Sequence, residues 1–282
     1  MATVQFGRIW RKHLLMVIQM VVLVAIAAVF IYPFVRVFLS SLKDKAGVLA
    51  NPWGFPKTLR FENFSQAWTQ GNLGRVLFNS MLVTVSSVLI TTVFAAPAAY
   101  YFTRVRFRGK LLYYPILLSM VIPTAVLIIP MTFLENRLGI VDTYWGLIMP
   151  YTALHVPLCI FILSNFFASL PPALEEAALI DGAARFQVLR HIVMPVSRPA
   201  VFAAMSLVFI FIWNEFTLAL VVVTEPSLFT IPLGLKAFAG SYSYDYPLVF
   251  AALGIVNIVL IGILVFLQRH FVKGIVAGAT KY

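Results

Sequence analysis

The sequence predicts an all-α integral membrane protein with six transmembrane helices. Of its 282 residues, 61% are hydrophobic and only 11% are charged, with a mean hydropathy of +0.94. A water-soluble chain cannot bury that much apolar surface. The apolar residues also gather in six runs that can cross the roughly 30 Å hydrocarbon layer, which takes about 20 helical residues. Backbone groups find no water in lipid, so each run should be helical.

The six runs are almost free of charge. Five contain no Asp, Glu, Lys or Arg, and the fifth contains only Glu215. A charge at the centre of a membrane helix costs about 2.5 to 3.5 kcal/mol on insertion scales. Glu215 is therefore expected to be paired, hydrated or protonated. The first run is longer than a signal-peptide core and is expected to be a retained anchor. The expected spans are 14–35, 76–103, 111–134, 145–167, 199–224 and 247–268.

The positions of the basic residues predict the orientation. Thirteen of the 21 Lys and Arg residues lie on the same side of the expected spans as the N-terminus, and eight lie on the other side. Cytoplasmic loops carry the excess of Lys and Arg, so both termini should be cytoplasmic. The net charge of +11 is thus mostly a topology signal, and nucleic-acid binding is not expected. The single cysteine, Cys159, permits no internal disulfide.

Five segments follow from the spans and the orientation. They are a cytoplasmic N-terminal segment 1–13, the six-helix membrane domain 14–268, a cytoplasmic loop 169–195 within that domain, a cytoplasmic tail 269–282, and an outer segment 40–75 expected to form a short helix and turn. The basic turn that begins at Arg104 is interpreted as a topology determinant rather than a ligand site.

The loop 169–195 is expected to form a helical hairpin. One helix should begin near Pro171, and Gly182 should end it because glycine readily adopts the left-handed conformation. A second helix should cover 183–193 and present an apolar face. On these grounds alone, the loop would be an amphipathic hairpin at the membrane surface.

The spacing within the loop is more specific than that. The run Glu176-Ala-Ala, then three residues, Gly182, nine residues, Ile192, one residue and Met194-Pro195 resembles the E-A-A-x3-G-x9-I-x-L-P motif of permease subunits of ATP-binding cassette importers. Met194 replaces Leu, an apolar residue of similar volume. The six spans, the chain length, the sequence Trp-Asn-Glu-Phe at 213–216 and the tail are similar to the carbohydrate, maltose-type branch of that family.

The resemblance implies partners and a coupling role for the loop. It implies a second permease subunit, expected in a heterodimer, two ATPase subunits that bind ATP and Mg, an extracellular or periplasmic solute-binding protein, and a prokaryotic inner membrane. The chain has no G-x4-G-K-[S/T] motif, so it is expected to be non-catalytic and to hold no cofactor or metal. The residues expected to couple to the ATPase are Glu175, Glu176, Ala177, Ala178, Asp181, Gly182, Phe186, Ile192 and Pro195.

Three polar residues should lie at a similar depth in the membrane. Counted from the outer ends of their spans at 1.5 Å per residue, His155, Glu215 and Asn257 lie roughly 14 to 15 Å deep. They are predicted to form a polar layer near the translocation path, with Trp213 and Asn214 close by. A structural clasp between helices that never contacts the substrate explains the same residues equally well.

The last outer loop is a candidate contact for the binding protein. It carries Gly240, Ser241, Tyr242 and Tyr244, and the resemblance to maltose-type permeases implies that this stretch reaches into the binding protein. An ordinary ordered loop explains it nearly as well.

The function that these features favour is import of a sugar. A glycerol-phosphate or polyol permease of the same class is the alternative, but no basic residue lies within the spans, which favours a neutral cargo. A gradient-driven transporter with Glu215 as its proton site is less favoured. A membrane-embedded enzyme has the least support, because no nucleophile and base or metal-ligand cluster has a recognisable spacing.

Overall fold

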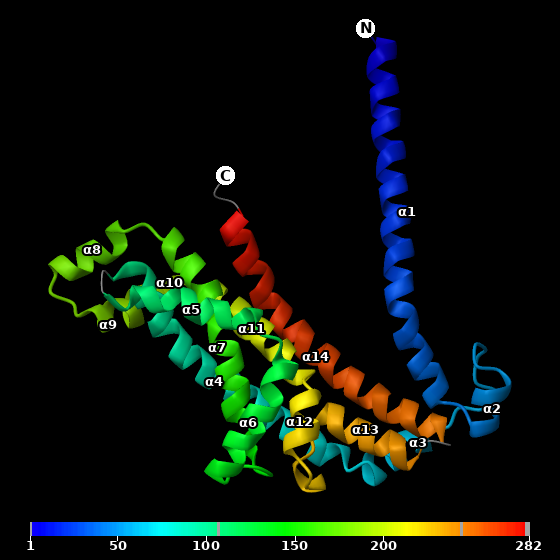
Figure 1. Cartoon of the computed structure of the whole chain (residues 1–282). Helices are drawn as coiled ribbons and strands as arrows, with labels where there is room; N and C mark the ends of the chain where they lie inside the picture. Colours follow the sequence, from blue (N-terminus) through cyan, green and yellow to red (C-terminus); the bar gives the residue numbers. More distant parts are fainter. Residues whose placement is uncertain (1, 106–107, 243–244, 280–282) are drawn as a thin grey trace. The chain divides into compact units, whose positions relative to one another are not determined.

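The chain is helical throughout the part that the structure describes (Figure 1). The computed structural model describes residues 2–105, 108–242 and 245–279, with side chains except those of 2–12, 108, 110 and 267–279. The described chain contains no strand. It divides into two compact units, one made of Met1–Gly71 with Phe238–Ile258 and the other of Asn72–Ala237 with Val259–Tyr282.

The first unit contains the first apolar helix and the outer segment that follows it. Helix α1 (Ala2–Ser41) is exposed along the whole of its expected span. Helix α2 (Lys45–Ala50) begins after Asp44, whose carboxylate accepts a hydrogen bond from the Gly47 amide at 2.9 Å. Helix α3 (Glu62–Gln70) is joined to the end of α1 through Asn63, whose Nδ2 donates to the carbonyls of Ser41 and Lys43 at 2.7 and 3.0 Å.

The second unit is built around two long helices. Helices α4 (Leu73–Arg104) and α7 (Tyr144–Ser169) pack along each other, and α11 (Arg198–Trp213) packs against both. Fully buried Ala95 and Ala99 on α4 permit a close approach of the helices. The remaining membrane-domain elements are η1 (Arg108–Leu112), α5 (Tyr113–Leu118), η2 (Ser119–Val121), α6 (Thr124–Leu138), α12 (Thr217–Val222) and η4 (Pro226–Leu228). Helices α13 (Ile231–Ser241) and α14 (Tyr246–Ala279) each contribute to both units.

Four of the expected spans correspond to single helices in the described chain. They are His13–Ser41, Leu73–Arg104, Tyr144–Ser169 and Tyr246–Phe266. Two spans are interrupted. In the third, Tyr113–Val121 and Thr124–Leu138 meet at 107° around Pro123, which has no N–H to continue a helix. In the fifth, α11 ends at Trp213 and α12 begins only at Thr217, and α11 itself meets the preceding segment Arg185–Val196 at 81°.

The third span is also longer than expected and is not free of charge. Helix α6 continues to Leu138 and includes Glu135, which is only 4% exposed. The helix that covers the end of the third expected span therefore contains a buried carboxylate just beyond the expected boundary. The expected boundary at residue 134 had assigned Glu135 to a loop.

Candidate functional site

The loop between α7 and α11 folds as a helical hairpin. Helix α8 (Ala173–Ile180) ends at Gly182, which has a φ of +87° and whose amide donates to the Leu179 carbonyl at 3.2 Å. Helix α9 (Arg185–Val188) then continues as a π-helical turn, η3 (Leu189–Val193), and a short α10 (Met194–Val196). In the described chain the loop thus consists of a helix, a left-handed glycine and a second helix that widens into a π turn.

One acid of the loop is held inside the chain. Glu175 is 5% exposed, and its carboxylate accepts a hydrogen bond from the Tyr100 hydroxyl at 3.0 Å and pairs with Nε of Arg104 at 3.1 Å. The guanidinium of Arg104 also donates to the carbonyls of Phe167 and Leu170, where α7 ends. Arg104 thus joins α4, α7 and α8. It has this structural role in addition to the role as a topology determinant that the sequence predicted for its turn.

The rest of the loop divides into a buried face and an exposed face. Val188, Leu189 and Val193 form the buried face of the second half of the hairpin. On the exposed face, Ile180 is 85% exposed and Phe186 is 57% exposed. Of the other expected coupling residues, Glu176, Ala177, Asp181, Gly182 and Pro195 are exposed, and Ala178 and Ile192 are half-buried.

Glu215 lies at the break in the fifth span. Its carboxylate accepts hydrogen bonds from the amides of Leu218 at 2.8 Å and Ala219 at 3.3 Å, which are the otherwise unpaired donors at the start of α12. It also accepts a hydrogen bond from the Tyr151 hydroxyl at 2.6 Å. The interruption and the half-buried acid therefore explain each other: the break leaves two N–H groups without helical partners, and the Glu215 carboxylate accepts hydrogen bonds from both.

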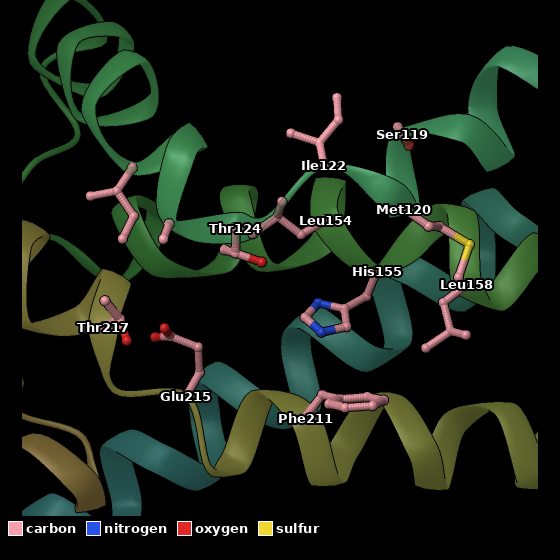
Figure 2. Close-up of a pocket in the computed structure, with 12 residues that line it drawn as sticks. Ser119, Met120, Ile122, Thr124, Leu154, His155, Leu158, Phe211, Glu215 and Thr217 are labelled. Atoms are coloured by element: carbon pink, nitrogen blue, oxygen red, sulfur yellow. The ribbon is translucent and has the colours of Figure 1, made fainter.

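A cavity of about 350 Å³ opens beside Glu215 (Figure 2). His155 lies in it with its ring 6.0 Å from that of Phe211, and its Nδ1 is 2.7 Å from the Tyr151 carbonyl oxygen. Figure 2 shows the Glu215 carboxylate next to Thr217. The polar lining is completed by two hydroxyl residues on the other wall, and the full lining is Ser119, Met120, Ile122, Thr124, Ala125, Ile128, Leu154, His155, Leu158, Phe211, Glu215 and Thr217.

The predicted polar layer is brought together only in part. His155 and Glu215 line the same cavity, but the hydrogen bonds of Glu215 in the described chain go to Tyr151 and the two amides. Trp213 is buried against Phe209, with ring centroids 5.3 Å apart, and Asn214 is exposed with its Nδ2 donating to the Ile210 carbonyl. Neither lines the cavity. Asn257 belongs to the first unit, so its place in such a layer stays a prediction.

Sequence reasoning missed several contributors to this site. Tyr151 lies one helical turn before His155, at a spacing of four residues that places both on one face of α7. That spacing could have pointed to Tyr151. Thr217, Ser119 and Thr124 come from segments whose breaks the apolar pattern does not mark.

The segment that follows α12 is fixed by two sets of hydrogen bonds within the second unit. Asp142 accepts hydrogen bonds from the hydroxyl and amide of Thr224 and from the amide of Glu225. The Thr224 hydroxyl, followed by the Glu225 amide, holds the pKa of Asp142 below its usual value. On α4, Nδ2 of Asn79 donates to the carbonyls of Ser227 and Phe229 at 2.9 and 3.0 Å.

The expected binding-protein contact lies at the end of α13. Gly240 and Ser241 are in its last turn, and the ring of Tyr242 packs against Phe238 at 4.8 Å. Tyr244 lies outside the described residues. Within the described chain, no group of three or more His, Cys, Asp and Glu residues is arranged to hold a metal ion.

The sequence matches a known family of transport proteins and is similar to individual members of it. Residues 91–277 match the family described as binding-protein-dependent transport system inner membrane component. The chain is 32% identical to the diacetylchitobiose uptake system permease protein NgcG of Streptomyces coelicolor, over 90% of this chain and 85% of the relative. It is 34% identical to the trehalose transport system permease protein SugB of Mycobacterium tuberculosis, over 88% of this chain and 92% of the relative.

The fold is also found in a solved structure. A chain of a bacterial ABC transporter that imports the acidic polysaccharide alginate superposes with a TM-score of 0.76 and 24% sequence identity, covering 90% of this chain and 95% of that chain. At that identity the likeness shows the fold alone.

Proposed function

The chain belongs to the family of binding-protein-dependent transport system inner membrane components, and on this premise we propose that it is the permease subunit of an importer whose cargo is a carbohydrate. It is a non-catalytic membrane subunit, so ATP is hydrolysed by a separate subunit. The names of the two relatives above specify diacetylchitobiose and trehalose, which are both sugars. We infer that a binding protein outside the cell delivers a cargo of the same class to this chain.

The helical hairpin is the part that we assign to energy coupling. Ile180 and Phe186 present exposed apolar side chains at its tip, and Glu176 adds a free carboxylate beside them. A small apolar surface with one acid fits a cleft in a soluble partner, and the partner proposed here is an ATPase subunit that holds ATP and Mg. The Glu175–Arg104 pair and the buried Leu189 would transmit a displacement of the tip to α4 and α7.

The assembly inferred for the complete importer has two permease subunits and two ATPase subunits. We expect the second permease to be a different polypeptide, and both termini of this chain to face the cytoplasm. The excess of Lys and Arg on the N-terminal side of the spans supports that orientation. The end of α13 and the loop after it, with Gly240 and Tyr242, would then lie outside, where the binding protein docks.

The cavity beside Glu215 is proposed as part of the cargo path. Its wall combines the aromatic face of Phe211 with hydroxyl, imidazole and carboxylate groups, which suits a sugar that presents both C–H faces and hydroxyls. No Lys or Arg is among its described lining residues. A phosphate-bearing cargo would favour basic groups in the path, so the lining supports a neutral sugar over a glycerol phosphate.

A structural clasp remains the competing role for this cluster, and one substitution separates the two. Thr217 lines the cavity but makes none of the hydrogen bonds that hold Glu215. Thr217→Val should raise the KM for the transported sugar by about fivefold, the value of one hydrogen bond of about 1 kcal/mol, and leave thermal stability unchanged. Asn214→Ala, on the exposed side of the same break, is the control. An unchanged KM for Thr217→Val would favour the clasp.

The chemical class of the cargo can be tested by purification of the whole importer. Co-purification with this chain, followed by mass spectrometry, should identify an ATPase, a second permease and a secreted binding protein. The binding protein should then bind oligosaccharides rather than glycerol phosphate in a calorimetric titration. Binding of glycerol phosphate alone would refute the carbohydrate assignment while leaving the family unchanged.

A further inference from the structure

The outer segment of the first unit contains a second cavity, of about 540 Å³, unrelated to the cargo path. It lies between the end of α1, helix α2 and the chain that leads toward α3. Its wall carries two lysines and one acid, with Phe55 at the rim. The complete lining is Lys43, Asp44, Ala46, Gly47, Ala50, Asn51, Phe55, Pro56, Lys57 and Thr58.

The cavity has more positive charge than the chain neutralises. Lys43 is only 3% exposed, and its Nζ donates to the Asn51 carbonyl at 2.8 Å, which uses one of its three N–H bonds. Burial, and next the charge of Arg36, lower the pKa of Lys43. The acid in the wall, Asp44, is already engaged by the Gly47 amide.

One nitrogen of the Arg36 guanidinium is unsatisfied within the part of the chain that the structure describes. The guanidinium carbon of Arg36 lies 4.8 Å from the ring centre of Trp53, and the Nη1 of Arg36 is buried with no hydrogen-bond partner among the described residues. A buried guanidinium N–H without an acceptor is costly. Lys43 and Lys57 line the cavity, and Arg36 lies close enough for its charge to act on Lys43, so these three residues form a cationic cluster that an anion in the cavity would neutralise.

The cluster lies at the end of the first candidate span, His13–Ser41: Arg36 is in its last two turns, and Lys43 follows the span by two residues. Trp53 stacks on Tyr32 with ring centroids 6.1 Å apart, and Tyr32 is nine residues, or about 14 Å of helix, before Ser41. The chain after α2 thus folds back along α1, as Figure 1 shows. Trp53 is 71% exposed and Phe55 83% exposed. Exposed aromatic rings beside an apolar helix are typical of the membrane–water interface.

We propose that this cavity binds the phosphate headgroup of an anionic phospholipid in the leaflet at the end of α1. The basic residues supply the charge that a phosphodiester needs, and the aromatic residues at the rim place the site at the depth of the headgroups. An acidic loop of a soluble protein would meet the same cations. It would not explain why Trp53 reaches back to Tyr32 or why Phe55 is almost fully exposed. The site does not depend on the nature of the cargo.

Native mass spectrometry on the complete transporter tests the site. The transporter is extracted from vesicles of phosphatidylglycerol and phosphatidylcholine in equal amounts, and the retained lipids are counted. The wild type should retain phosphatidylglycerol in preference. Lys57→Gln should weaken that retention by about fivefold, because one basic residue near a membrane surface contributes about 1 kcal/mol. Lys57 is exposed, so the substitution should not disturb the fold.

Lys45→Gln is the matched control. Lys45 is an exposed lysine two residues from Lys43, and it does not line the cavity. It should leave retention at the wild-type level, and added glycerol phosphate at millimolar concentration should not displace the lipid. Equal retention of both lipids by the wild type would overturn the proposal. So would an equal loss in the two variants, displacement by glycerol phosphate, or a Lys57→Gln variant that loses binding-protein affinity while keeping its lipid.

Discussion

The ion pair between Arg104 and Glu175 should be the most sensitive point of the coupling loop. Both side chains are nearly buried, with 11% and 7% of their surfaces exposed, so water screens the pair very little. Arg104→Met would leave the Glu175 carboxylate buried, with the Tyr100 hydroxyl as its one remaining hydrogen-bond partner among the described residues. Removing one member of a buried pair costs about 3 to 5 kcal/mol. The carbonyls of Phe167 and Leu170 would also lose their donor.

The loss of stability in Arg104→Met can be measured by thermal unfolding of the purified permease in detergent, monitored by tryptophan fluorescence. A loss of about 3 kcal/mol in a chain of this size corresponds to a midpoint lower by about 5 °C. The double variant Arg104→Met with Glu175→Gln should recover much of the loss, because removing both charges leaves no unpaired ion.

The neighbouring acid provides the control. Glu176→Gln removes an exposed carboxylate and should leave the midpoint within about 1 °C, because exposed ion pairs contribute little. The same variant should weaken association with the ATPase. The reasoning would be refuted by an Arg104→Met variant that unfolds at the wild-type temperature, or by a Glu176→Gln variant that is equally destabilised.

Three further predictions concern single residues. Gly182→Val should leave the chain folded in the membrane but weaken ATPase docking, because a β-branched residue is strained at a φ of +87°. Gly182→Asn should retain docking, because asparagine tolerates the left-handed conformation. Normal ATP-driven uptake by the valine variant would contradict this role. Glu135→Gln should raise the midpoint of thermal unfolding, because both carboxylate oxygens of Glu135 are buried without a hydrogen-bond partner among the described residues, and a lower midpoint would indicate a missing cationic partner. Asp142→Asn should lower stability at neutral pH. Because folding depresses the pKa of Asp142, the stability that its charge contributes is present above about pH 4 and is lost as the pH falls through the folded pKa. The difference between the two proteins should therefore shrink as the pH falls below about 4, and a difference that does not shrink would assign the effect to something other than this charge.

The membrane fold could be predicted because lipid imposes it on the sequence. Apolar runs must be helical where no water satisfies the backbone, so composition and run length are enough to predict the elements. The interruptions could not be predicted in the same way. The break after Trp213 is stabilised by the Glu215 carboxylate and by Tyr151, a residue far away in the sequence. A hydropathy pattern contains no information about such a contact.

In the coupling loop, too, some features could be predicted from the sequence and others could not, and two adjacent acids show the difference. The start signal near Pro171 and the left-handed preference of Gly182 predicted a helix followed by a glycine turn, and the described chain has a helix and a glycine of positive φ there. Which of the two neighbouring acids faces inward depends on the rotational phase of α8 against α4, and on the presence of Arg104 at that point. Sequence alone treated Glu175 and Glu176 as equivalent. The structure gives them opposite environments, and therefore different expected phenotypes.

Uptake of labelled oligosaccharide into proteoliposomes is the most direct measurement of the mechanism proposed for this chain. The liposomes would contain the permease pair with or without the ATPase subunits, and the binding protein would be supplied outside. Uptake should require both the ATPase subunits and ATP on their side of the membrane, and Gly182→Val should abolish most of it. Uptake that continues without the ATPase, driven by a proton gradient alone, would contradict the account.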